Sequence, residues 1–108
     1  MVTDKEIKLV DQLLDKTRRR SITWEPTAKN DEFVSTLWVQ TLGGRVSFTI
    51  GAWRDTETLT MKDELDRVLL NVESDSIPQV SELYAEARRV ALKVDESLDS
   101  VHDQLGRM

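Results

Sequence analysis

The apolar positions in the last third of the chain follow a helical period. They are spaced alternately by four and three residues: Val80, Tyr84, Ala87, Ala91, Val94, Leu98, Val101 and Leu105. This heptad pattern predicts one long helix from about Pro78 to Leu105. Such a helix would be roughly 40 Å long, whereas a six-residue strand spans only about 20 Å. We therefore expect the second half of the helix to extend beyond the domain with its apolar side uncovered.

The beginning of the chain predicts another amphipathic helix, at about residues 4–19. Thr3 and Glu6 form a capping box, in which the threonine side chain binds a backbone N–H group of the first turn. The apolar stripe that follows has helical spacing and consists of Ile7, Val10, Leu13, Leu14 and Thr17.

Between the two helices the period changes from 3.6 to 2, which is typical of strands. Ile22–Glu25 predicts a short strand that ends at Pro26, and residues 33–40 and 45–50 predict two strands joined by a turn at Gly43–Gly44. Residues 58–73 allow two interpretations. Thr58–Arg67 is rich in helix formers, but alternation over residues 58–62 and 68–73 favours a hairpin.

These elements predict a single α+β domain over residues 1–108. Its two layers are an antiparallel β-meander of four to five strands and both helices, packed on one face of the sheet. The apolar face is expected to hold Ile22, Trp24, Phe33, Leu37, Val39, Val46, Phe48, Ile50, Leu59, Met61, Val68, Leu70 and Val72.

The number of strands decides the relative direction of the helices. With five strands the helices run roughly parallel, and the late acidic residues of the second helix lie near an arginine cluster at the end of the first. The acidic residues are Asp95, Glu96, Asp99 and Asp103, and the cluster is Arg18, Arg19 and Arg20. With four strands the helices are antiparallel and this pairing within one chain fails. Acidic residues late in a helix oppose its dipole, and the arginine cluster would offset them, either within one chain or across a dimer.

The composition of the chain limits where the protein is expected in the cell and which kinds of site it can contain. The chain has no cysteine, which removes disulfides, thiolate metal sites and cysteine nucleophiles. It has no apolar run long enough for a transmembrane helix, and its first residues are charged and polar rather than apolar as in a signal peptide. We therefore expect a cytoplasmic protein.

No motif predicts catalysis. A Gly-x-Ser-x-Gly turn is absent, and Gly43–Gly44 precedes no helix that could bind phosphate. His102 lies three residues after Asp99, but such spacing is common by chance in a charged helix. We therefore expect no enzymatic activity, no cofactor and no metal site.

The main candidate surface is the second half of the heptad stripe, formed by Val94, Leu98, Val101 and Leu105. Leaving four such side chains in water would forgo about 1.5–3 kcal/mol each. The stripe therefore predicts a homodimer or a protein partner, and hence an interaction or regulatory module. The alternative is that the whole stripe lies on the chain's own sheet, because Ala87 and Ala91 allow close approach.

Two further surfaces are candidates. Arg18, Arg19 and Arg20 would be the contact of a nucleic-acid-binding accessory protein, although the net charge of −5 opposes this and an ion-paired helix end is the alternative. On the outer face of the sheet, Val34, Trp38 and Leu69 would form an apolar binding patch. The alternatives there are a strand register shifted by one residue, which would turn Trp38 inward, and a loop that covers it.

Two segments carry a resemblance. Ile22–Thr27, directly after the first helix, and Leu83–Asp99 resemble a group of small, uncharacterised bacterial and phage-borne proteins of about this length. The resemblance covers the first and last thirds of the chain. It implies no activity and no functional residue, and it slightly favours the hairpin at residues 58–73.

Overall fold

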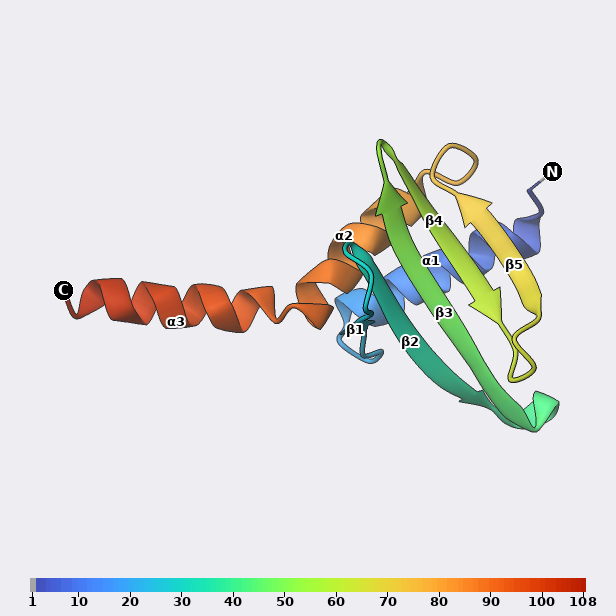
Figure 1. The fold of residues 1–108 in the computed structure, drawn as a ribbon, viewed down its shortest axis with the longest axis horizontal. Coiled ribbons are helices and arrows are strands. Elements are labelled where there is room, and N and C mark those ends of the chain that lie inside the picture. Colours follow the sequence, from blue (N-terminus) through green and yellow to red (C-terminus); the bar gives the residue numbers. More distant parts are fainter. Residues whose placement is uncertain (1) are drawn as a thin grey trace.

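The computed structural model describes residues 2–108 and has the predicted α+β architecture (Figure 1). Helix α1 is followed by five strands in a meander and then by two helices. The elements are α1 (Asp4–Arg18), β1 (Glu25–Pro26), β2 (Glu32–Val39), η1 (Gln40–Leu42), β3 (Gly44–Trp53), β4 (Thr56–Lys62), β5 (Val68–Glu73), α2 (Gln79–Ala91) and α3 (Val94–Gly106). The sheet order is β1-β2-β3-β4-β5, and every neighbouring pair is antiparallel.

The register confirms the predicted hairpins. Phe33 pairs with Ile50 across β2 and β3, and Leu59 pairs with Val72 across β4 and β5. The turn between β2 and β3 contains the short 3₁₀ helix η1 and ends at Gly43, whose φ of 63° lies in the left-handed region. Residues 58–73 are therefore a hairpin and not a helix.

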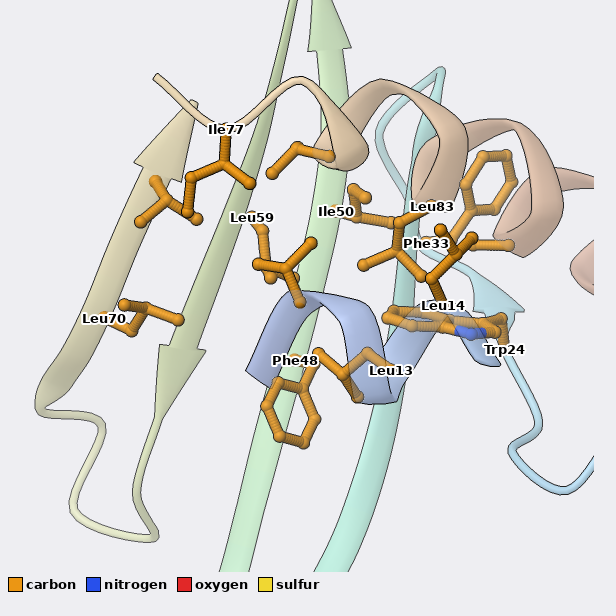
Figure 2. Packing of buried hydrophobic residues seen from close by; sticks show 14 of the residues in the cluster. Leu13, Leu14, Trp24, Phe33, Phe48, Ile50, Leu59, Leu70, Ile77 and Leu83 are labelled. Carbon is orange, nitrogen blue, oxygen red and sulfur yellow. The ribbon is translucent and has the colours of Figure 1, made fainter. Parts of the chain in front are cut away.

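Helices α1 and α2 cover the same face of the sheet, and the core lies between the two layers (Figure 2). Thr3 caps α1 as predicted, since its Oγ1 accepts a hydrogen bond of 3.2 Å from the Glu6 N–H. The buried apolar residues are Val10, Leu13, Leu14, Trp24, Phe33, Val46, Phe48, Ile50, Leu59, Leu70, Val72, Ile77, Val80, Leu83 and Ala87. Burial at this scale is the main stabilising contribution of the fold.

The first strand is shorter than the sequence predicts. Only Glu25–Pro26 pairs with β2, because the preceding residues are tied to the end of α1. The Ser21 N–H donates to the Lys16 carbonyl oxygen at 2.9 Å. The buried Trp24 Nε1–H donates to Thr17 Oγ1 at 3.0 Å, and that hydroxyl donates to the Leu13 carbonyl oxygen at 2.7 Å. Residues 21–24 therefore lie against the end of α1 and do not pair with β2. In the described part of the chain, the outer edge of β2 after Val34 has no neighbouring strand.

Two positions of the predicted inner face are exposed. Leu37 lies near the end of β2 and its side chain is about half exposed. Val68 was expected beside Leu70, but a register shift near Met61 and Lys62 pairs it with Lys62. Lys62 shares the outer face with Thr58 and Thr60, so the irregularity turns Val68 away from the core.

The predicted single C-terminal helix is wrong, because the chain breaks between α2 and α3. Lys93 has φ 52° and ψ 47°, a left-handed conformation that ends α2 and starts α3. The first half of the heptad stripe lies on the sheet as expected, with Val80 and Ala87 fully buried. Helix α3 extends away from the body of the molecule and buries no residue (Figure 1).

Candidate functional site

Helix α3 carries an apolar stripe that the rest of the described chain leaves uncovered. Leu98, Val101 and Leu105 have side chains between 57% and 62% exposed, while Val94, next to the break, is half-buried. Their spacing of three and four residues places them on one side of α3. The structure therefore keeps three of the four predicted interface residues together and accessible.

The charges of α3 lie away from this stripe. At about 100° per residue, Glu96, Asp99 and Asp103 point to the side of the helix opposite Leu98 and Leu105. The uncharged Ser97 and Gln104 border one edge of the stripe, and Asp95 and His102 border the other. The apolar surface is thus flanked mainly by polar groups without net charge.

The break between the helices is held by an ion-paired cluster around Asp95. Arg20 Nη2 lies 3.2 Å from Asp95 Oδ2, and Arg89 binds the other carboxylate oxygen. The Arg89 and Arg20 guanidinium groups lower the pKa of the Asp95 carboxyl below its usual value. Arg20 also binds Glu86 and the Thr17 carbonyl oxygen, so the cluster joins the ends of α1, α2 and α3.

This cluster confirms one part of the predicted charge pairing. Helices α1 and α2 run in about the same direction (Figure 1), and Asp95 reaches the end of α1 as expected for five strands. As a pairing within one chain, the rest of the expectation is wrong for residues 2–108. Asp103 binds Arg107, the residue that follows α3, at 3.2 Å, and neither Glu96 nor Asp99 pairs with the arginines.

The three arginines are all neutralised by nearby carboxylates. Arg18 binds Glu82 at 3.3 Å and Arg19 binds Asp15 at 3.1 Å, in addition to the two partners of Arg20. A phosphate contact would have to compete with these ion pairs on a chain with a net charge of −5. The geometry is that of an ion-paired helix end.

The predicted patch on the outer face of the sheet is not continuous. Trp38 is 60% exposed and pairs with Arg45, so the register is as predicted and the indole points outward. Leu69 is also exposed, but it lies on β5, whereas Trp38 lies on β2. Strands β3 and β4 separate the two residues in the sheet. Val34 is half-buried beside Glu25 and Thr49. The structure therefore does not bring Val34, Trp38 and Leu69 together.

A hollow that the sequence did not predict lies at the other end of the outer face. It has a volume of about 510 Å³ and is lined by Lys29, Asn30, Asp31, Glu32, Thr49, Gly51, Ala52, Trp53, Thr58 and Thr60. Trp53 is 76% exposed. The available signal was the alternation of β3 and β4, which places Thr49, Gly51, Trp53, Thr58 and Thr60 on one face.

His102 lies on the exposed surface of α3, beside Asp99 and Asp103. Within residues 2–108, no group of three or more potential ligand side chains is placed to hold a metal ion. The same part of the chain contains no helix with the length and apolar character needed to cross a bilayer.

Comparison of the chain with protein-family models, with curated proteins and with solved structures finds no match. The resemblance to small bacterial and phage-borne proteins stays a prediction.

Proposed function

We propose that this protein is a non-enzymatic interaction module that forms a homodimer through the apolar stripe of α3. The observation that carries the proposal is the exposure of Leu98, Val101 and Leu105 on a helix that buries nothing against its own domain. Isolated helices shorter than about 12–15 residues are marginal in water. Helix α3 has 13 residues, so packing against a partner would stabilise it.

A second copy of the chain fits the stripe better than a charged partner does. Two α3 helices can pack stripe to stripe while Glu96, Asp99 and Asp103 stay on their outer sides in water. Ser97 and Gln104 then lie at one edge of the contact and introduce no repulsion. At the other edge, the charge of Asp95 is offset within its own chain by Arg20 and Arg89. A basic partner would be attracted to the acidic side of α3, which is not the apolar side.

The expected dimer is weak. Full burial of a leucine or valine is worth about 1.5–3 kcal/mol, and these side chains are already a little under half buried. Three from each copy would therefore contribute roughly 5–10 kcal/mol, against a cost of association of about 4–15 kcal/mol. At its most favourable the balance is about 6 kcal/mol, so we expect a dissociation constant of roughly tens of micromolar or higher.

The test is the mass in solution, measured by light scattering or sedimentation from about 10 µM to about 1 mM, a range that brackets the expected affinity. The wild-type mass should rise from that of one chain towards that of two. Leu98→Asp combined with Val101→Asp should remain monomeric. Because α3 contributes nothing to the core, circular dichroism should show the body of the variant intact.

A matched control is Ser100→Asp combined with Arg107→Ser. It changes the net charge by the same −2, but both positions lie on the side of α3 away from the stripe. This variant should dimerise like the wild type. A wild-type protein that stays monomeric up to about 1 mM would refute the homodimer.

A further inference from the structure

The hollow on the outer face of the sheet has the dimensions and the lining of a small-ligand site. Ligand pockets in proteins usually enclose about 300–1,000 Å³, and this one has about 510 Å³. It lies on the face of the sheet that neither α1 nor α2 covers. It is also independent of the stripe on α3, since no α3 residue lines it.

The floor of the hollow is rich in hydroxyl groups and is bordered by one carboxylate-bearing side chain, that of Glu32, which lies directly opposite Gly51 across β2 and β3. Thr49 lies directly opposite Thr60 across β3 and β4, and Gly51 lies opposite Thr58. Threonine hydroxyls can both donate and accept hydrogen bonds. Gly51 has no side chain, so a ligand can approach the backbone there, next to the Glu32 side chain, whose Cβ and Cγ lie 3.7 Å from the position that a Cβ at Gly51 would take.

One wall of the hollow is the indole of Trp53. The Arg54 guanidinium carbon lies 5.8 Å from the centre of this ring and stacks over one of its faces. Trp53 is nevertheless 76% exposed, so most of the indole surface remains open to a ligand. An aromatic ring held in this way offers a flat apolar surface at little entropic cost.

Another part of the rim is a loop that its own hydrogen bonds hold in place. Thr27 Oγ1 donates to Glu32 Oε1 at 2.9 Å and accepts from the Lys29 N–H at 3.1 Å. The Asp31 carbonyl oxygen accepts from the Ala52 N–H at 3.1 Å, which ties the loop to β3. The rim is therefore organised before any ligand binds, which reduces the cost of binding.

From these features we infer that the hollow binds a neutral sugar unit of an oligosaccharide. A pyranose ring has an apolar C–H face that can stack on Trp53 and hydroxyl groups that can exchange hydrogen bonds with Thr49, Thr58 and Thr60. At the rim, the Lys29 ammonium can donate to a sugar hydroxyl. A nucleic acid is disfavoured, because the lining has no excess of positive charge and the chain carries −5 overall.

The experiment is a titration of the ¹⁵N-labelled full chain with three probes, followed by NMR of the tryptophan indole N–H groups. The probes are hexasaccharides of β-1,4-linked glucose, α-1,4-linked glucose and β-1,4-linked N-acetylglucosamine, each up to about 10 mM. At least one should shift the Trp53 indole signal in a saturable manner. The signals of buried Trp24 and of Trp38, which is exposed outside the hollow, should stay in place.

Variants identify the site. Trp53→Ala should weaken the interaction by about tenfold or more, because the stacking surface is lost, whereas Trp38→Ala should bind like the wild type. Gly51→Ala should keep the fold, since the added Cβ would meet its nearest atom, the Asp31 carbonyl oxygen, at an ordinary 3.5 Å. It should still weaken binding because the methyl group occupies the floor.

The remaining outcomes overturn the inference. These are the absence of a Trp53 shift with all three probes, or backbone shifts that give Trp53→Ala the same affinity as the wild type. The variant Leu98→Asp with Val101→Asp should bind sugar normally, so failure of the dimer and failure of this site are separable.

Discussion

The hydrogen bond between Trp24 and Thr17 joins the first loop to α1. Removing it should lower the free energy of unfolding by an amount that the structure predicts. Both side chains are almost completely buried, and the Thr17 hydroxyl is the acceptor for the Trp24 indole N–H at 3.0 Å. Thr17→Val keeps the shape of the side chain but removes this acceptor. The indole N–H would then be buried without a partner, which costs about 1–3 kcal/mol.

The measurement is the free energy of unfolding from urea titrations, in a double-mutant cycle with Trp24→Phe. Thr17→Val should lower this free energy by about 2 kcal/mol in the wild-type background. In the Trp24→Phe background no indole N–H remains, so the same substitution should cost close to nothing. The expected coupling between the two positions is therefore about 1–3 kcal/mol.

Thr17→Ser is the control, because it keeps the acceptor and removes only a methyl group. It should cost about 1 kcal/mol in both backgrounds, as expected for one buried methyl group. If Thr17→Val has the same cost whether residue 24 is tryptophan or phenylalanine, the hydrogen bond does not contribute to the free energy of unfolding.

Two further predictions concern the break before α3 and the turn after β2. Arg89 and Arg20 lower the folded-state pKa of Asp95 from the usual 3.8, so these ion pairs stabilise the break at pH values above 3.8 and are lost as the pH falls through the lower folded value. The Asp95 carboxyl resonance should therefore titrate with a pKa below 3.8, and a pKa at or above 3.8 would contradict the pairing. As the pH falls through this acidic range, the free energy of unfolding should decrease less for Asp95→Asn than for the wild type. Gly43→Ala should cost about 1 kcal/mol in urea titrations, because φ is 63° and the added Cβ would meet no atom within 4 Å, so the cost is backbone strain alone; an unchanged stability would mean that the turn relaxes.

The strands were predictable because each pattern is local. Alternation across β3 and across the β4–β5 hairpin sets which side chains enter the core, and the observed pairing of Phe33 with Ile50 and of Leu59 with Val72 agrees with it. A one-residue irregularity is not visible in such a pattern. The register shift near Lys62 moved Val68 to the outer face although its spacing from Leu70 is regular.

The heptad stripe does not predict the break between α2 and α3, because the stripe continues through it without interruption. The charges on either side of Lys93, in contrast, do indicate a break. Arg88 and Arg89 suit the last turn of a helix, and Asp95 and Glu96 suit the first turn of another. As late residues of one long helix these acids would oppose the dipole, but as first residues of α3 they are favourable.

The sequence by itself determined the element types, the meander and the part of the heptad stripe that lies on the sheet. These depend on the period of apolar residues and on short turns, which act between near neighbours in the chain. The tertiary structure decided where the last helix breaks, that Asp95 meets Arg20, and that the loop before β2 closes a hollow beside Trp53. These features depend on groups distant in sequence, such as Arg20 and Asp95, whose meeting follows only from the packing of α1 and α2 on one sheet.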